Sequence, residues 1–283
     1  MLDYYYFMIQ GFEAPFGYVH KNFVGLMEWP KCWEIDEAKR LLSLTGGTDF
    51  ESRSSLMADT LRRNHEAQKI HSLMHWANEE FPVYSSSGEH VLNFDRCGVD
   101  LFGVINYSVH MIGWVMTADG IKIWVPRRAK TKMSFAGKLD NTVGGSLPSD
   151  ERPIDGIVRE CKEEIRLPPE YTRSNIKSCG TKSFQLTITD LLEPACQHQV
   201  QYLYEIELTQ DIVPTIGDGE VGELLLMSIP EVMAAMYNGD FKLTCNMTYL
   251  AFFIRHGYIN AENEPNLVEI CSRLHRRHAL FIA

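Results

Sequence analysis

The sequence has no long hydrophobic run and few cysteines. No stretch approaches the 18 or so consecutive apolar residues of a transmembrane helix. The seven cysteines are odd in number, lie far apart and form no C-x-x-C pair, which favours reduced thiols over disulfides or a thiolate zinc site. The apolar first residues lack a basic segment and a small-residue cleavage site, so they predict a buried strand and not a signal peptide. We therefore expect a cytoplasmic protein with no membrane partner.

Basic segments are also scarce. The 37 acidic residues outnumber the 27 basic ones, and the net charge is −10. This balance argues against a nucleic-acid polymer as the main partner, because such proteins carry a basic surface. A small phosphorylated ligand remains compatible with the charge if metal ions mask the protein's own carboxylates. Both a monomer and a homodimer fit the composition.

The chain is long enough for one large domain or two smaller ones. We predict an N-terminal α/β domain over residues 1–98, a second domain over 99–240 and C-terminal helices over 241–283. Apolar residues recur at roughly helical spacing in the first region, which predicts a helix over 54–80. Gly257 is expected to end a helix over 246–257, and a further helix is expected over 266–277.

The spacing of apolar residues changes in the central region, from a helical period to one typical of strands. Two apolar runs flank Ala118-Asp119-Gly120, and this predicts a β-hairpin because both central turn positions can take positive φ. Further strands are expected over 182–189 and 198–208, and helices over 153–166 and 229–238. Strands and helices mixed in this way indicate an α/β or α+β sandwich.

The helix predicted over 153–166 carries three crowded carboxylates. Its apolar stripe leaves Glu160, Glu163 and Glu164 outside, within about one turn of each other. Carboxylates at this spacing repel one another, and a hard divalent cation relieves the repulsion. Upstream, Gly144 and Gly145 allow the backbone to approach a metal or ligand closely. The alternatives are a solvated face balanced by nearby basic residues, or chance clustering in an acidic protein.

The spacing around these glutamates resembles the Nudix box. From Gly145, five residues lead to Glu151, and seven more lead to the pair Arg159-Glu160. After Cys161 and Lys162, the pair Glu163-Glu164 completes the charged positions of the box. The resemblance implies an α/β fold, a Nudix α/β/α sandwich, with the N-terminal α/β domain before it and the C-terminal helices after it.

The resemblance also implies roles for these residues. The ligands of Mg²⁺ or Mn²⁺ would be Glu160, Glu163 and Glu164, with a backbone carbonyl of Gly144 or Gly145. Arg159 would orient Glu160, and Glu151 would pair within the loop and helix. One of the glutamates, or a further acid, would activate the attacking water. Glu220 is the candidate for that further acid, because it precedes an apolar strand as such residues do in the family; an ordinary loop carboxylate is the alternative.

Three positions depart from the resembled pattern. Arg166 stands where the box closes on glycine, at an expected cost of about 1 kcal/mol in helix capping. Ser146 and Asp150 stand where relatives often have glycine, so the loop is expected to be tighter.

Segments outside the box narrow the resemblance. "MHWANEEFPVY", "LFGVINYSVHMIGWV" and "HQVQYLYEIEL" are similar to the thiamine-pyrophosphokinase-related Nudix proteins, and this similarity covers nearly the full chain. It implies hydrolysis of thiamine diphosphate, or of its damaged analogues, to the monophosphate and phosphate. Other organic diphosphates, such as 8-oxo-dGDP or a prenyl diphosphate, are the alternatives within enzymes. A non-catalytic diphosphate sensor is the alternative outside them.

Candidate substrate-binding residues lie before the box and on a later strand. A basic cluster could meet phosphate oxygens, although an ordinary basic loop is the alternative. An aromatic side chain could stack a flat ring, and a strand amide could hydrogen-bond it. The residues are Arg127, Arg128, Lys130, Lys132, Phe135 and Gln201.

Overall fold

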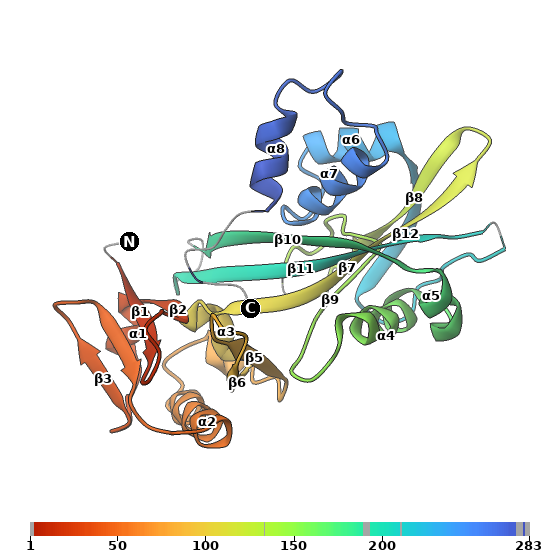
Figure 1. Ribbon diagram of the computed structural model, residues 1–283. Helices are drawn as coiled ribbons and strands as arrows, with labels where there is room; N and C mark the ends of the chain where they lie inside the picture. Colours follow the sequence, from red (N-terminus) through yellow and green to blue (C-terminus); the bar gives the residue numbers. More distant parts are fainter. Residues whose placement is uncertain (1–2, 133, 189–192, 210, 276–279, 281–283) are drawn as a thin grey trace.

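The computed structural model describes residues 3–132, 134–188, 193–209, 211–275 and 280 (Figure 1). An N-terminal part is built on a four-stranded sheet, and a larger part is built on a six-stranded sheet with helices on both faces. Among the described residues, no helix combines the length and the apolar character needed to cross a membrane.

The N-terminal part forms its own hydrophobic core. Its main sheet has the order β2-β1-β4-β3, and a separate hairpin pairs β5 with β6. Phe7 of β1 is fully buried among the rings of Trp33, Phe94 and Phe102, and alternate residues of β1 point into this core. The strand expected at the start of the chain is therefore confirmed. The elements are β1 (Tyr4–Ile9), β2 (Gly17–His20), α1 (Lys21–Leu26), β3 (Trp33–Asp36), β4 (Leu41–Leu44), α2 (Phe50–Glu66), β5 (Glu80–Tyr84), β6 (His90–Asp95) and α3 (Arg96–Phe102).

The helix predicted over 54–80 is wrong in its second half. Helix α2 starts after a capping box at Asp49 and ends at Glu66. Gln68 then takes a left-handed backbone conformation with a φ of 54°, and only a short 3₁₀ turn over Ser72–Met74 follows. Ile70 and Leu73 are buried in the same core as α2, so the apolar spacing reflects burial without a continuous helix.

The larger sheet has the strand order β10-β11-β7-β8-β12. Strand β9 pairs with residues 108–111 of β7, and β8 pairs with residues 114–117 of the same strand. Strands β7 and β8 form the hairpin that Asp119-Gly120 predicted, and Gly120 has a φ of 103°. The strands are β7 (Ile105–Thr117), β8 (Gly120–Arg128), β9 (Val143–Ser146), β10 (Lys177–Ile188), β11 (Ala195–Glu207) and β12 (Val221–Ser228). Thr189, the last residue of one predicted strand, lies outside the described residues.

Helices cover both faces of this sheet. Helix α4 (Pro153–Ile165) packs on the face that carries Tyr107, Val109 and Met111 of β7. Helices α6 (Ile229–Tyr237) and α7 (Cys245–Arg255) pack on the other face. The predicted Nudix α/β/α arrangement is confirmed, and the short helix α5 (Pro169–Asn175) beside α4 is an element that the sequence pattern had not predicted.

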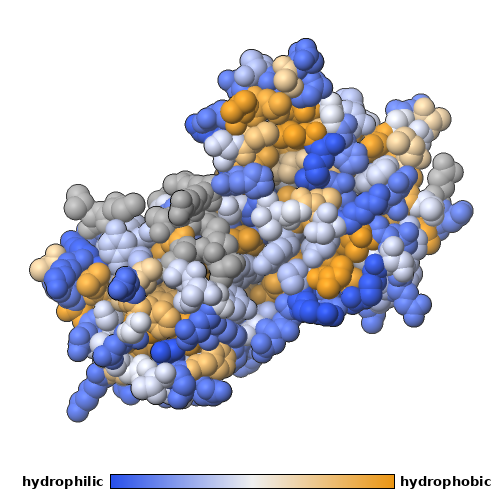
Figure 2. Space-filling view, viewed as in Figure 1, coloured by the Kyte–Doolittle hydropathy of each residue, from blue (hydrophilic) through white to orange (hydrophobic). Residues whose placement is uncertain are grey.

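Helix α8 (Leu267–Leu274) follows α7 and lies on the same side of the sheet as α6 and α7 (Figure 1). It confirms the last predicted helix, although residues 276–277 lie outside the described part. Hydrophobic residues gather over these C-terminal helices at the top of Figure 2. Leu243 and Val268 belong to the exposed apolar residues of this region. The predicted domain boundaries stay predictions, but the N-terminal core extends to Val104 and β7 begins at Ile105.

A lysine is buried beneath the C-terminal helices. Lys182 of β10 is 1% exposed, and its Nζ donates a hydrogen bond to the carbonyl oxygen of Thr244, just before α7, at 2.6 Å. Burial, opposed by Cys245 and Asp140 and assisted by the charge of Lys242, lowers the pKa of Lys182 from 10.5 to about 7.

Replacing Lys182 with methionine should flatten the increase of stability with pH. Between pH 7 and 10.5 the unfolded chain binds a proton that the folded chain does not, so the free energy of unfolding rises with pH. From pH 7 to pH 9 the unmodified protein should gain roughly 2 kcal/mol more than Lys182→Met. Urea denaturation at the two pH values measures this difference, and equal slopes in both proteins would contradict it.

Candidate active site

The crowded glutamates lie on α4, directly after strand β9 and the loop 147–152. Strand β9 pairs with β7, so that Gly144 lies opposite His110 and Gly145 opposite Val109. The apolar residues Ile157, Cys161 and Ile165 of α4 are fully buried against β7 and β11. The glutamates of the same helix therefore lie beside β9. The sequence pattern therefore folds as a strand, a loop and a helix around one group of acids.

The glycine pair lets β9 fit between two side chains. A Cβ atom on Gly145 would overlap the carboxylate of Glu160. A Cβ atom on Gly144 would lie 2.5 Å from Nδ1 of His110. Any larger residue would displace one of these groups, so the close approach of β9 to both requires glycine.

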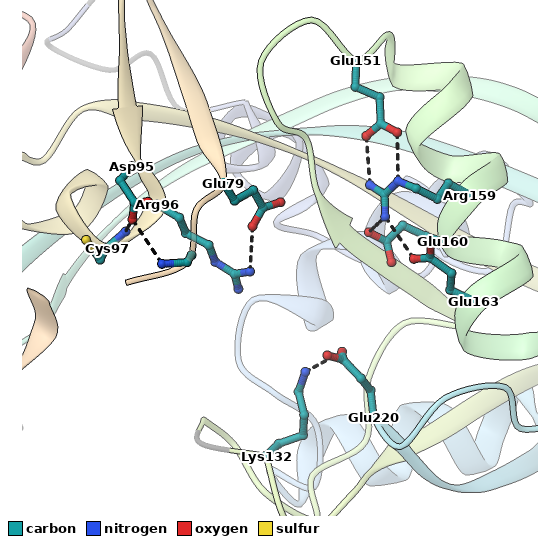
Figure 3. Close-up of polar contacts among 11 residues, drawn as sticks. Glu79, Asp95, Arg96, Cys97, Lys132, Glu151, Arg159, Glu160, Glu163 and Glu220 are labelled. Carbon is teal, nitrogen blue, oxygen red and sulfur yellow. Dashed lines mark hydrogen bonds and ion pairs between the residues drawn. The ribbon is translucent and has the colours of Figure 1, made fainter. Parts of the chain in front are cut away.

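Arg159 joins three of the acids in one network (Figure 3). Its Nε and Nη2 donate to the two carboxylate oxygens of Glu151, each at 2.9 Å. Its Nη1 donates to Oε1 of Glu160 at 2.8 Å and to Oε2 of Glu163 at 3.1 Å. The bidentate contact fixes the guanidinium plane, and the remaining nitrogen orients the two helix glutamates.

Glu164 lies apart from this network and is deeper. It is 9% exposed, and its Oε2 accepts a hydrogen bond from the backbone N–H of Gly144 at 3.2 Å. Burial raises the pKa of Glu164 well above its usual value, and the charge of Glu160 adds to this effect. Burial also raises the pKa of Glu160, although Arg159 opposes the shift. The negative charge of Glu220 raises the pKa of both groups further.

A cavity of about 280 Å³, open to solvent, brings several of these groups together. Glu164 and Gly144 form one side of it, and Glu220 reaches it from the segment before β12. The Glu220 carboxylate forms an ion pair with Lys132 (Figure 3). The full lining is Pro126, Arg128, Asp140, Asn141, Gly144, Glu164, Glu220 and Val221.

The other candidate binding residues lie elsewhere. Arg127 pairs with Glu223 at 3.1 Å and donates to the carbonyl oxygen of Gly137. Lys130 and Phe135 are exposed on the loop that follows β8. Gln201 is buried on β11 and does not line the cavity.

Sequence reasoning missed three residues beside the acids. Asp140 forms an ion pair with Arg128 at 2.7 Å. Asp140 and the next residue, Asn141, both line the cavity. The ring of His110 packs against Gly144. Burial lowers the pKa of His110 to about 3, so this ring is neutral at pH 7. The only signal in the sequence was that Asp140-Asn141 directly precedes the strand carrying the glycine pair.

A polar wall continues from the cavity across the sheet face opposite α4. Strand pairing places Gln201 opposite Ser108, and His110 lies two residues further along β7. Among the described residues, four buried atoms here have no hydrogen-bond partner: Ser108 Oγ, His110 Nδ1, Asn141 Oδ1 and Gln201 Oε1. Leaving such an atom unpaired costs roughly 1–3 kcal/mol, so the polar wall is suited to a ligand or to water.

The acids are suited to a hard divalent cation by their chemistry. Within the described ranges no three His, Cys, Asp or Glu side chains already surround a common metal position. Arg159 accounts for part of this, because it holds Glu160 and Glu163. The available donors are nevertheless carboxylate oxygens, and burial and neighbouring negative charges raise the pKa values of Glu160 and Glu164. A divalent cation relieves both effects, so the donor set fits Mg²⁺ or Mn²⁺.

Comparisons with known proteins cover both parts of the chain. A family model described as "NUDIX domain" matches residues 108–247, and one described as "Domain of unknown function (DUF4743)" matches residues 3–106. An uncharacterised protein of Saccharomyces cerevisiae is 31% identical over 287 residues, which cover 96% of this chain and 83% of the yeast protein.

Two plant proteins are similar along the same length. Nudix hydrolase 24, chloroplastic, of Arabidopsis thaliana is 31% identical over 267 residues, covering 93% of this chain and 70% of the plant protein. Nudix hydrolase 20, chloroplastic, of the same plant is 30% identical over 277 residues, covering 94% of this chain and 71% of its own length. The similarity therefore includes the N-terminal part as well as the acid helix.

Two of the departing positions adopt left-handed backbone conformations. Asp150 has a φ of 66° in the loop before α4, and Arg166 has a φ of 55° at the C-cap of that helix. The Arg166 guanidinium donates only a 3.3 Å hydrogen bond to the carbonyl oxygen of Gly217. Glycine adopts this conformation without the steric cost that a side chain adds.

Replacing Arg166 with glycine should stabilise the protein. We expect the free energy of unfolding to rise by roughly 0.5–1 kcal/mol, because glycine relieves the left-handed strain at the end of α4. Arg173→Gly, inside α5, is the matched control and should lose a similar amount. Urea denaturation of the three proteins decides this, and a destabilised Arg166→Gly variant would show that the side-chain contact outweighs the strain.

Proposed function

Because this chain belongs to the Nudix hydrolase family and is a diphosphate hydrolase, we propose that its substrate is thiamine diphosphate or a damaged analogue. Water attacks the terminal phosphorus, and the bond from that phosphorus to the bridging oxygen breaks. The products are inorganic phosphate and the organic monophosphate, and the water supplies the oxygen and the protons that complete them. The main support for this type of reaction is the cluster of Glu160, Glu163 and Glu164 on α4.

We propose that Glu160, Glu163 and Glu164 hold Mg²⁺ or Mn²⁺, with a backbone carbonyl of Gly144 or Gly145. When bound, the cation neutralises the diphosphate oxygens and lowers the pKa of the attacking water. Glu151 keeps Arg159 in place through the bidentate contact, and Arg159 in turn orients Glu160 and Glu163. The buried Glu164 accepts the Gly144 N–H bond, which ties the helix acid to β9.

The proposed phosphate end of the site is the cavity beside Glu164. Arg128 lines it and Lys132 reaches it through Glu220, so two cations of the basic cluster lie near the acids. Glu220 is our candidate for the further metal ligand or general base. Two observations support this role: the charge of Glu220 raises the pKa values of Glu160 and Glu164, and Glu220 lines the same cavity as Glu164.

The polar wall supports a polar ring as the organic group. Asn141 Nδ2 donates to the carbonyl oxygen of Cys245 at 3.4 Å, which fixes the amide so that Oδ1 faces away without a partner. Such acceptors suit the amino group of thiamine, the Ser108 hydroxyl can donate to a ring nitrogen, and a prenyl chain has no polar group to bond either. An oxidised nucleotide such as 8-oxo-dGDP also carries these groups and remains the second candidate. A diphosphate sensor is disfavoured, because every charged position of the box is present.

The cellular setting is part of the proposal. All seven cysteines are free, three of them buried, which supports the reducing cytoplasm that we propose. The two Arabidopsis relatives are named chloroplastic. A monomer and a homodimer remain the predicted states.

Replacing Glu164 with glutamine should abolish turnover. The variant keeps the shape and the hydrogen bond to Gly144 but loses the negative charge, so kcat should fall by about a hundredfold or more. Phosphate release with Mg²⁺ measures this. Glu170→Gln, on the exposed first turn of α5, is the matched control and should retain full activity. An unchanged rate in Glu164→Gln would refute the assignment of the acid helix.

Measuring kcat/KM for several organic diphosphates should show which organic group the site prefers. We expect kcat/KM for thiamine diphosphate or oxothiamine diphosphate to exceed that for farnesyl diphosphate by about a hundredfold or more, with 8-oxo-dGDP as the competing compound. Gln201→Met should reduce the ratio of kcat/KM between the thiamine compounds and farnesyl diphosphate, because it removes a hydrogen-bond acceptor of the polar wall. Gln185→Met, on the neighbouring strand and the opposite sheet face, should leave this ratio unchanged. No turnover of the thiamine compounds alongside turnover of another substrate would overturn the specific proposal.

A further inference from the structure

The N-terminal domain holds the loop that leads into the acid helix. The backbone N–H of Ser149 donates to the carbonyl oxygen of Glu80, on β5, at 2.7 Å. The Ser149 hydroxyl donates to Oδ1 of Asn93, on β6, at 3.0 Å. Both bonds cross from the N-terminal hairpin to the middle of the loop 147–152, so one residue of the loop is fixed through its main chain and its side chain.

Asn93 is itself rigidly held. It is 8% exposed, and its backbone N–H donates to the hydroxyl of Ser54, on α2, at 2.9 Å. Its Nδ2 donates to the Glu80 carboxylate at 2.7 Å, and its Oδ1 lies 2.7 Å from Nε2 of His90. Asn93 therefore has partners on three elements of the N-terminal domain, and its side-chain amide cannot turn without breaking the bonds to Glu80 and His90.

A short path leads from this anchor to the acids. Ser149 is followed by Asp150, whose left-handed backbone turns the chain, and then by Glu151. Glu151 holds Arg159 through two hydrogen bonds, and Arg159 contacts Glu160 and Glu163. A shift of the loop would move Glu151 away from the guanidinium and leave the two helix glutamates without their common donor.

We propose that the N-terminal domain is a positioning part of the active site, with Asn93 and Ser149 as its positioning residues. The domain fixes the loop before any ligand arrives, so that Glu151 and Arg159 already stand in register. Preorganisation of this kind removes the cost of ordering the loop during turnover. This assigns a catalytic purpose to the part of the chain that matches a domain of unknown function.

Hydrogen exchange of the loop tests the anchor without a substrate. In the full chain, Ser149→Ala and Asn93→Ala should each speed exchange in the peptide over 147–152 by roughly tenfold. Ser54→Ala is the matched control: it also removes a hydrogen bond of Asn93, but on the side away from the loop. It should leave exchange in 147–152 unchanged. Unchanged exchange in both Ser149→Ala and Asn93→Ala would overturn the proposal.

Kinetics test the consequence for the acids, and this arm alone rests on the proposed function. With Mg²⁺ and thiamine diphosphate, Ser149→Ala and Asn93→Ala should lower kcat by about tenfold or more, with KM changed less than about threefold. The double variant should be no slower than the slower single one, since both residues act through the same bond. Ser149→Thr keeps the hydroxyl and should restore kcat.

The outcomes separate the two proposals. No turnover of any organic diphosphate by the unmodified protein would sink the proposed function, and the exchange measurement would then decide the positioning role alone. Turnover that is slowed equally by Ser54→Ala and Ser149→Ala would show a general effect on stability and would overturn the positioning role. Additive losses in the double variant would also overturn it.

Discussion

Burying carboxylates beside one another is the constraint on which this structure depends. Glu160 and Glu164 lie about one helical turn apart with little access to water; burial raises the pKa of both, and the charge of Glu160 raises that of Glu164 further. The surrounding features offset this repulsion one by one. The glycine pair brings a backbone N–H to Glu164, Arg159 brings a positive charge to Glu160, and Glu151 keeps Arg159 from turning away. An apolar helix stripe alone would not hold such a group together.

The parts of the site that could be predicted from the sequence are those fixed by local geometry. The glutamates share one face because of the helical period, and Arg159 reaches Glu163 because they are four residues apart. Arg166 and Asp150 were recognised as departures, and both adopt the left-handed conformation that glycine favours. Local rules also gave the hairpin at Asp119-Gly120. In each case the residues that interact are neighbours in the chain.

The parts that could not be predicted depend on distant segments. Periodic spacing suggested a helix beyond Glu66, whereas Ile70 and Leu73 keep that spacing because the N-terminal core buries them. His110 meets the glycine pair only through the pairing of β7 with β9, and the Asn141 amide takes its orientation from Cys245 of α7. Ser149 looked like an ordinary loop residue because its partners, Glu80 and Asn93, lie more than fifty positions away. No local pattern contains that information.

The backbone of strand β9 lies between two groups of side chains. The acid helix lies on one side of the glycine pair, and His110 with the rest of the polar wall lies on the other. If the polar wall binds the organic group, as we propose, substitutions around His110 should alter substrate preference while Glu160 keeps its place on the other side of β9. The two glycines touch both groups, so residues 144 and 145 are where an added side chain would disturb either the acids or the polar wall.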